Sequence, residues 1–552
     1  MTPRHRAPKD RKTKLASRKT NNYITPNELD GNAILVEPGG ALKGIFPMIS
    51  GLQRKALVVA VGMTLAVAVG IFWFANNRGG ATPDSSASSS PAPFHKPVPS
   101  ILPDPVEHPG STFRPSAAIQ AQSSDMAQAP TIVAEINTGS GSEPCIAVSP
   151  FDARLVAITH HHVPRTAAAG LTGVRVSRDG GRIFSEVKKQ PWAGHVPVFH
   201  AQVAWGPGPG TNSSRLWWID AIMAGADKIS TGITYSDDIG ATWAPLYIEQ
   251  RTPPWVGGFP DITVDNNLKS PNFGAVYATY NWLESSKGPG LAILASGDDG
   301  KSWQLASVPA VGLPDHPFSW RINYRIKPAP DGSAVVSFYE SNLRHWSKDN
   351  LFNQGGTNNV GRRGFATSHL HFDRSSKTMT ADKPRLAITL QHDPESVIAD
   401  PQWQTGFDID SSGRVWMAVS DHQKSGTVYL GCSDDFGSRW DFKMFAIEGQ
   451  SSYKPSVAVK DGVVFLGFHA LDGKGTVGTY FTTSSDNGAH FSKIRPVNNV
   501  RWSLSSLAEL SNGAGLRERA DFGADGLVRY AYGDGRKGNR VVSIFEAIIK
   551  IQ

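Results

Sequence analysis

The sequence predicts an all-β fold, a β-propeller of seven blades, with six blades as the alternative. Beyond Thr131 there is no sustained helical periodicity, and short β-branched and aromatic runs alternate with Gly, Asp, Asn and Pro. A turn motif recurs at nearly regular intervals over much of this region. Repeats of roughly 40–60 residues that each hold several short strands are typical of propellers.

The recurring motif is Ser-x-Asp-x-Gly-x-x-aromatic, as in "SDDIGATW" at 236–243. Its serine and aspartate are expected to bond to nearby backbone groups, the glycine to take a positive φ, and the aromatic to start the next strand. We therefore predict a structural role for the motif, as the folded corner of each blade. Its five aspartates are Asp179, Asp238, Asp298, Asp435 and Asp486. The interval between the third and fourth is more than twice each of the others and holds two units, so one unit has lost its motif.

Strand-like runs outside the motif raise the count of units from five to seven. Each unit has a first strand, as in "GFPDITVD", and a second strand, as in "VYATYNWL". The last unit, 519–551, lacks room for a fourth strand. The run "PTIVAEIN" at 130–137 is expected to supply it, because pairing of the two ends closes a propeller without exposed edges.

The part of the chain before the propeller predicts a membrane anchor. The segment 56–75 carries no charge, and as a helix it spans about 30 Å, the thickness of the hydrocarbon core. Residues 1–55 hold 11 Lys/Arg and 4 Asp/Glu, so the positive-inside rule places them in the cytoplasm. Residues 76–130, rich in Pro, Ser and Ala, form a linker, and the propeller at 131–552 is periplasmic or extracellular. The chain is thus predicted to be a single-pass membrane protein.

Composition narrows the classes of partner. The formal charge of +7 resides in the tail, and the 44 basic and 44 acidic residues beyond it cancel, which argues against a nucleic-acid partner. Two cysteines, Cys145 and Cys432, are expected to be buried thiols, with one disulfide as the alternative. His160 and His162 alternate on one strand, but they lack a clear third ligand, so no metal and no cofactor is predicted.

Residues 131–551 resemble the Asp-box (BNR-repeat) propellers of the sialidase-like superfamily. The five boxes carry this resemblance, together with a last unit similar to the closing blade of secreted sialidase-like propellers. "YRIKPAPDG" at 324–332 is similar to the sialidase Tyr-Arg-Ile-Pro strand, although Lys327 intrudes and the strand belongs to the fourth unit. The resemblance implies an arginine triad for a carboxylate, a Tyr–Glu nucleophile pair and an acidic aspartate. The candidate catalytic residues are Arg325, Arg519, Glu340, Tyr530 and Asp421, with Arg321, Arg517 and Tyr532 as further members. The alternative is that these arginines bridge blades.

Propeller topology predicts a polar ring on the face where the first strands begin, at the ends of the second strands. Its members are His160–His162, Asp220, Asn281, Glu340, Asp421, His422, His469 and Asp534. The long loop 340–364 on the same face carries polar and aromatic residues suited to recognition. The candidate ligand-binding residues are Arg344, Trp346, Trp282, Glu340 and His469. We expect a glycan or an envelope protein as partner; a sialidase-type glycosidase and a scaffold subunit of an envelope complex are the alternatives.

Overall fold

A computed structural model describes most of the region predicted to form the propeller. The described residues are 130–161, 172–187, 191–192, 194–210, 213–223, 229–249, 258–284, 288–309, 311, 318–343, 362–391, 405–421, 426–503, 518–538 and 542–551. Within these ranges the structure contains strands and no helix long and apolar enough to cross a membrane. The predicted anchor at 56–75, with its tail and linker, lies outside the described residues.

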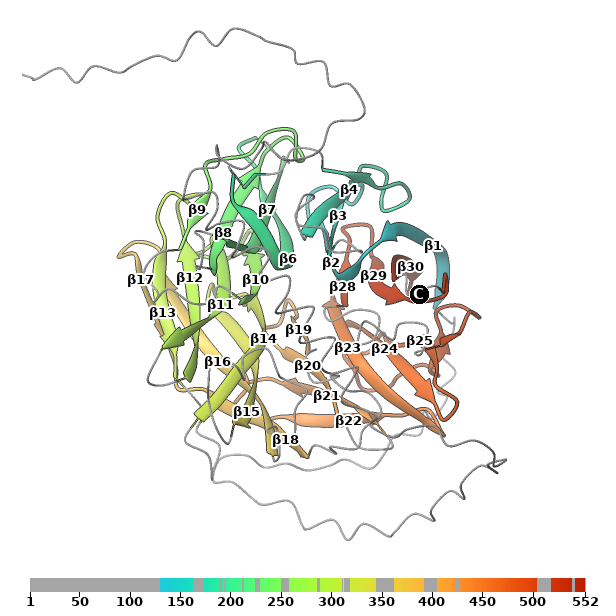
Figure 1. Ribbon diagram of the computed structural model, residues 1–552. Coiled ribbons are helices and arrows are strands. Elements are labelled where there is room, and N and C mark those ends of the chain that lie inside the picture. Colours follow the sequence, from blue (N-terminus) through green and yellow to red (C-terminus); the bar gives the residue numbers. More distant parts are fainter. Residues whose placement is uncertain are drawn as a thin grey trace, which may run out of the picture. The chain divides into compact units, whose positions relative to one another are not determined.

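The strands form seven antiparallel sheets, which follow one another around a ring (Figure 1). The first sheet holds β2 (Ser142–Val148), β3 (Val156–His161), β4 (Thr172–Ser177) and β5 (Ser185–Glu186). The second holds β6 (Val196–Pro207), β7 (Ser214–Met223), β8 (Ile229–Ser236) and β9 (Tyr247–Ile248). The third holds β10 (Gly258–Val264), β11 (Val276–Glu284), β12 (Gly288–Ser296) and β13 (Gln304–Val308). The fourth holds β14 (Phe318–Pro328), β15 (Ala334–Leu343), β16 (Arg362–Asp373), β17 (Thr378–Ala381) and β18 (Arg385–Gln391).

Three further sheets complete the ring. The fifth holds β19 (Gly406–Ile409), β20 (Val415–Ser420), β21 (Val428–Ser433) and β22 (Asp441–Phe445). The sixth holds β23 (Gln450–Lys460), β24 (Val463–Asp472), β25 (Thr476–Ser484), β26 (Arg495–Pro496) and β27 (Trp502–Ser503). The seventh holds β28 (Arg519–Phe522), β29 (Leu527–Asp534), β30 (Ser543–Lys550) and β1 (Thr131–Ser140). We number the blades in this order.

The ring closes as predicted, because the first strand of the propeller completes its last blade. β1 pairs antiparallel with β30 from Thr131 opposite Lys550 to Ser140 opposite Ser543. The seven inner strands β2, β6, β10, β14, β19, β23 and β28 each contact the next, and β28 contacts β2. The prediction of seven blades is confirmed.

The hydrophobic core is divided among the interfaces between blades. Seven clusters of buried side chains each combine residues of two neighbouring blades, and the cluster between blades 7 and 1 includes Ile146, Ile158 and Ile544. Alternating residues of each sheet thus face opposite neighbours, as the period of two in a strand requires. Cys145 and Cys432 lie in different blades and are unpaired, as predicted; Cys145 is buried as expected, whereas Cys432 is only partly buried.

The turns that carry the motif share one set of hydrogen bonds. In the turn of blade 2, the Ser236 hydroxyl donates to Asp238 Oδ1 (2.8 Å) and accepts from the Gly240 amide (2.7 Å). Asp238 Oδ1 also accepts from the Thr242 amide (2.7 Å), and Gly240 has a φ of 87°. The same bonds recur around Asp179, Asp298, Asp435 and Asp486. These carboxylates cap turns at the end of the third strand.

Blade 4, which lacks the motif, still builds a corner around an aspartate. Asp373 ends β16, and its Oδ1 accepts from the amides of Ser375 (2.8 Å) and Ser376 (3.2 Å). Hydrogen bonds from these serines, the side-chain bond of Ser375 first, hold the pKa of Asp373 far below its usual value. The unit without a motif was expected from the long interval between Asp298 and Asp435. Its turn is of a different kind: by strand register Leu370 and Phe372 stand where blade 2 has Ser236 and Asp238, and Asp373 lies one residue beyond the position of the motif aspartate.

In five blades the pairing of the inner strand with the second strand shifts register at corresponding positions. The register to the second strand shifts at 143–144, 200–201, 259–260, 323–324 and 454–455. At three of these shifts a residue other than glycine has a positive φ: Glu143 (57°), His200 (67°) and Lys454 (51°). Bulges re-aim the side chains beside them, and strained backbone of this kind gathers at functional sites. The polar and charged side chains at the propeller axis follow directly after these register shifts.

Candidate ligand site at the propeller axis

The residue that follows the register shift in each inner strand contributes to one layer of side chains at the axis. The shift ends at Cys145 in blade 1, Gln202 in blade 2, Asp261 in blade 3, Arg325 in blade 4 and Ser456 in blade 6. In blade 5 the absence of a side chain at Gly406 leaves room for the backbone of Ser456. Arg519 completes the layer from blade 7, because it contacts Cys145 and Asp261. Each of the seven blades thus contributes one residue of its inner strand to this layer.

Two arginines in this layer share a single carboxylate across the axis. Arg519 Nη1 lies 3.2 Å from Asp261 Oδ1 and 3.2 Å from Cys145 Sγ, and Arg325 Nη1 lies 4.0 Å from the same Asp261 oxygen. Asp261 Oδ2 is already used, since it accepts from the Ile326 amide (3.0 Å). Blades 3 and 7 are not neighbours, so the contact between Asp261 and Arg519 spans the axis. Among the described residues, Asp261 is therefore the carboxylate that lies between the two guanidinium groups.

Arg325 is buried with part of its hydrogen-bonding capacity unused. Its side chain is 3% exposed, and neither Nη1 nor Nη2 has a hydrogen-bond partner within the described part of the chain. Burial lowers the pKa of Arg325; Asp261 partly offsets this effect and the charge of Arg519 adds to it. Gln202, in the same layer, leaves Oε1 without a partner among the described residues while its Nε2 donates to Ala201 O (2.7 Å). Buried polar atoms of this kind are normally satisfied by protein, water or ligand.

A second layer of charges lies two residues farther along the inner strands. Lys327 Nζ pairs with Asp408 Oδ1 at 3.0 Å, and Asp408 Oδ2 accepts from the Val459 amide of the next blade (2.9 Å). Asp521 Oδ2 accepts from the Val148 amide across the closure of the ring (2.8 Å). Burial raises the pKa of Asp521, against the opposing charge of Lys327. The contacts of this layer connect neighbouring blades. Lys327, the residue that interrupts the similarity to the Tyr-Arg-Ile-Pro strand, supplies its cation.

A buried Glu–His cluster adjoins the bulges of blades 1 and 2. Glu143 Oε2 lies 3.1 Å from His161 Nδ1 and 2.9 Å from His200 Nδ1, and the His200 amide donates to His161 Nε2 (3.0 Å). Burial alone would raise the pKa of Glu143, but the two histidines hold it well below its usual range. Asp220 nearby accepts from the Thr172 hydroxyl, and burial, reinforced by the charge of Glu143, raises its pKa well above the usual value. Two carboxyl groups with opposite pKa shifts form a pair suited to acid–base chemistry.

A second cluster joins blades 6 and 7. Glu518 Oε1 lies 2.5 Å from His469 Nε2, and Glu518 Oε2 accepts from the Tyr530 hydroxyl (3.0 Å). Tyr530 is fully buried and packs with Phe465 in the core between these blades. Burial, followed by the charge of Glu518, raises its pKa well above the usual value. The candidate Tyr530 thus contacts a glutamate that was not among the candidates, within an interface between blades.

The polar ring was predicted at the ends of the second strands, and this holds for Asp421, which follows β20, and for Asp534, which ends β29. In three other blades the predicted residue lies inside the strand. β7 continues to Met223 beyond Asp220, β15 to Leu343 beyond Glu340, and β24 to Asp472 beyond His469. Asp220, Glu340, Asp421, His469 and Asp534 are all buried. Glu340 Oε2 accepts from the Val311 amide (3.0 Å), and Asp421 accepts from the Thr427 amide (2.8 Å) and the Tyr429 hydroxyl (3.0 Å). Because these side chains are buried, they bond within the blades and do not form an exposed ring at the surface.

Several predicted residues fall outside the region that can be described. Arg344, Trp346, His162, His422 and Arg517 lie beyond the described residues, and the side chains of Trp282 and Arg321 are likewise not described. Their roles in binding or catalysis remain predictions. Among the histidines of "THHH", His160 pairs with Glu186 (3.2 Å), and it is His161 that joins the buried cluster.

Sequence reasoning missed Glu143, His200, Asp261 and Gln202, and it included His161 only as part of the run His160–His162. β3 alternates regularly, so His160 and His161 point to opposite faces, and the bulge in β2 places Glu143 beside His161. Counting alternate positions from His160 therefore follows the face that does not join the cluster. Asp261 in "GFPDITV" was available as a signal, because a charged residue within an otherwise apolar inner strand requires a buried partner.

No family model matches the chain, and no curated protein matches it. Among solved structures, it is similar to an α-L-arabinofuranosidase of Fusarium graminearum (9% identity, 62% of this chain and 93% of that chain, TM-score 0.39). A polysaccharide lyase of the ulvan lyase kind matches at 10% identity over 75% of this chain and 95% of that chain, with a TM-score of 0.43. A Hadza microbial sialidase matches at 12% identity over 76% and 96%, with a TM-score of 0.38. At this level of similarity no residue role is carried over from them.

Proposed function

We propose that the chain is a membrane-anchored, outward-facing propeller that recognises a carboxylate-bearing glycan at its axis. The observation that supports this most directly is the Arg325 guanidinium beside Arg519: its Nη1 and Nη2 have no hydrogen-bond partner among the described residues, and Asp261 lies between the two arginines. A second carboxylate, brought by a ligand, would complete the hydrogen bonds of Arg325 and balance the charge of the layer. Arginine is the side chain best suited to this task, because its planar fork matches a carboxylate with two parallel bonds.

Binding of matched sugar pairs tests this proposal. Full-length protein in detergent micelles is titrated calorimetrically with sialyllactose and a uronate oligosaccharide, each compared with its neutral counterpart. We expect the acidic sugars to bind and Arg325→Met to weaken binding about 10- to 100-fold, the loss of one charge-assisted hydrogen bond. Arg182→Ala, an exposed side chain in the turn between β4 and β5 of blade 1, serves as the control and should bind as the parent does. Equal affinity for acidic and neutral sugars would contradict a carboxylate site.

A glycosidase of the sialidase type is the second candidate. Two observations favour it: the contact between the Tyr530 hydroxyl and Glu518, and the pKa of Asp220, which burial raises well above its usual value and so favours the acid form. The burial of Tyr530 and its raised pKa oppose it, because a nucleophile must reach the substrate in an activated form. Hydrolysis of aryl sialosides that Tyr530→Phe abolishes would establish the enzyme. Binding of acidic sugars without turnover would establish recognition alone.

A further inference from the structure

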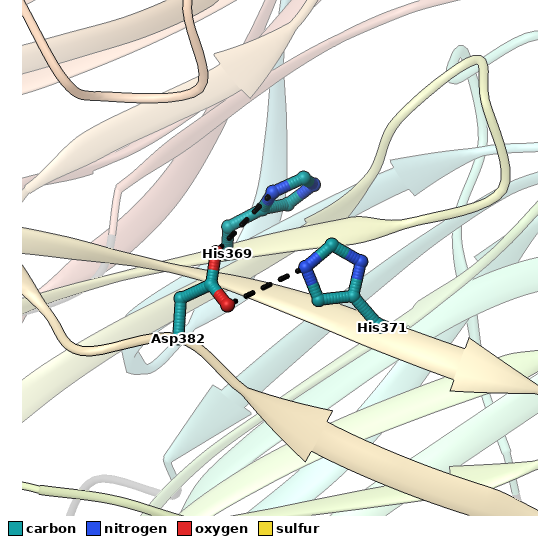
Figure 2. Close-up of side chains that lie close together, drawn as sticks. All are labelled: His369, His371 and Asp382. Atoms are coloured by element: carbon teal, nitrogen blue, oxygen red, sulfur yellow. Dashed lines mark ion pairs between the residues drawn. The ribbon is translucent and has the colours of Figure 1, made fainter.

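Three metal-ligating side chains meet in blade 4, away from the axis. His369 and His371 are alternate residues of β16, so both project from one face of the strand, and Asp382 follows β17 (Figure 2). His369 Nδ1 lies 3.8 Å from Asp382 Oδ2, and His371 Nε2 lies 3.5 Å from Asp382 Oδ1. One ligand atom from each of the three residues falls within 4.8 Å of the others.

The hydrogen bonds behind His369 determine which of its nitrogens carries the proton. The Ser333 hydroxyl donates its single hydrogen to Asp331 Oδ1 (2.5 Å), so Ser333 Oγ must accept from His369 Nε2 at 2.7 Å. With the proton of the neutral ring on Nε2, Nδ1 carries none. Nδ1 therefore holds a lone pair that faces a carboxylate. Two acceptors turned toward each other indicate that a cation belongs between them.

The ligands are held in place before any cation binds. The His369 ring stacks on Phe436 of blade 5, with 4.4 Å between ring centroids and 9° between ring planes. The Asp382 amide donates to His369 O (2.8 Å), and Asp382 O accepts from the Ser368 hydroxyl (2.7 Å), so the backbone that carries the carboxylate is fixed to β16. A carboxylate behind a ligating histidine, here Asp331 through Ser333, is the usual outer arrangement of a metal site.

A surface His–Asp pair elsewhere in the chain shows what an ordinary ion pair looks like. His490 Nδ1 and Asp486 Oδ2 approach to 2.7 Å, a hydrogen-bond distance, although both side chains are largely exposed. The contacts of Asp382 stop at 3.5 and 3.8 Å with the side chains of His371 and Asp382 about half exposed. In tetrahedral zinc sites with bonds of about 2.0–2.1 Å, neighbouring ligand atoms are about 3.3–3.4 Å apart. The spacing around Asp382 is closer to that of a metal site than to that of a hydrogen bond.

We propose that His369 Nδ1, His371 Nε2 and one oxygen of Asp382 bind a divalent transition metal, with zinc as the expected ion. Two imidazoles and one carboxylate suit zinc, and a fourth position is left for water or an outside ligand. The metal would join β16 to the segment after β17 and so stabilise the outer part of blade 4.

Stoichiometric metal binding tests the site. Full-length protein without a histidine tag, freed of metal by a chelator, competes with a chromophoric indicator for Zn²⁺, and Co²⁺ replaces zinc as a spectroscopic probe. We expect one tight site per chain, with the intense visible absorption of tetrahedral Co²⁺ and a melting temperature that rises with zinc. His371→Gln and Asp382→Asn should remove the site while the melting temperature without metal stays unchanged.

Two further variants separate this site from adventitious binding at the chain's other histidines. Ser333→Ala removes the acceptor of His369 Nε2 and should weaken zinc binding about 10- to 100-fold, as loss of an outer partner does. His490→Gln removes an exposed histidine next to an aspartate and should change nothing. Zinc binding that survives His371→Gln and Asp382→Asn, or falls equally with His490→Gln, would overturn the proposal.

Discussion

The turns that carry the motif and the layer at the axis follow opposite rules. The five turns repeat the same residues and hydrogen bonds, and each carboxylate is satisfied by groups a few positions away in the chain. The axial layer places a different residue in nearly every blade, and its polar atoms either meet across the ring or, as at Arg325, have no hydrogen-bond partner within the described part of the chain. The repeated turns serve the architecture, whereas the axial layer, where equivalent positions differ between blades, is the site that we propose for a ligand.

The first prediction removes the carboxylate that the two arginines share. Asp261→Ala leaves Arg519 and Arg325 without their common partner in a buried layer. Breaking a buried ion pair from one side costs about 3–5 kcal/mol, so we expect a loss of this size in the free energy of unfolding, measured by chemical denaturation. Asp441→Ala, at an exposed position of β22, is the control and should cost less than about 0.5 kcal/mol. A cost below about 1 kcal/mol for Asp261→Ala would mean that the arginines rely on other groups.

The second prediction concerns a turn. Asp238→Ala removes the acceptor of the Thr242 amide and of the Ser236 hydroxyl. We expect a loss of about 1–3 kcal/mol in unfolding free energy and unchanged binding of acidic sugars. Arg182→Ala, an exposed side chain in the equivalent turn of blade 1, should affect neither quantity. Unchanged stability together with lost binding would assign the turns to function and remove the contrast with the axis.

The architecture was open to prediction because its signals are local. Three features rest on interactions within one or two strands: the seven first strands, the closure by 130–137, and the corner built around an aspartate. Even the unit without a motif could be counted, from an interval of more than twice the usual length. The boundaries of the second strands were less accurate, because polar residues such as Asp220 and His469 looked like turn residues but are buried within strands.

The axial site was harder to predict because it depends on closure of the ring. Cys145 and Arg519 are 374 positions apart, and Asp261 and Arg519 are 258 apart, yet they meet at one point. The bulges that set their height are not visible in the pattern of alternation. Arg325 and Arg519 were selected only through the family resemblance, and Asp261, which relates them, was not selected at all. Interactions within the turns could be inferred from a single repeat, whereas those at the axis required all seven.

The third prediction separates function from stability at the axis. Arg325→Met replaces a buried charge that lacks hydrogen-bond partners at two nitrogens, among the described residues, with an apolar side chain of similar length. Because replacing a poorly compensated buried charge is often neutral or stabilising, we expect the unfolding free energy to stay within about 1 kcal/mol of the parent or to rise. Thermal and chemical unfolding of the ligand-free protein measure this. A loss of about 3 kcal/mol or more would show that Arg325 stabilises the ring, as an arginine that bridges blades would.

The fourth prediction, with the smallest expected effect, tests a turn by pH. Burial would raise the pKa of Asp298, but hydrogen bonds from Ser302, Ser296 and Lys377 lower it from 3.8 to about 2. A carboxylate with a depressed pKa in the folded state contributes stability above the unfolded value and loses it as the pH falls from about 3.8 toward 2. Asp298→Asn should therefore show a weaker loss of melting temperature over this interval than the parent. In free energy of unfolding, the difference between the two proteins should stay below about 1 kcal/mol. Solvent screens these interactions, because the Asp298 side chain is 30% exposed and that of its partner Lys377 is 59% exposed. Asp461→Asn, at an exposed turn, should follow the parent. Parallel curves for the parent and Asp298→Asn would show that the hydrogen bonds to Asp298 do not depend on its charge, and neutral groups would then suffice at the corners that the aspartates occupy.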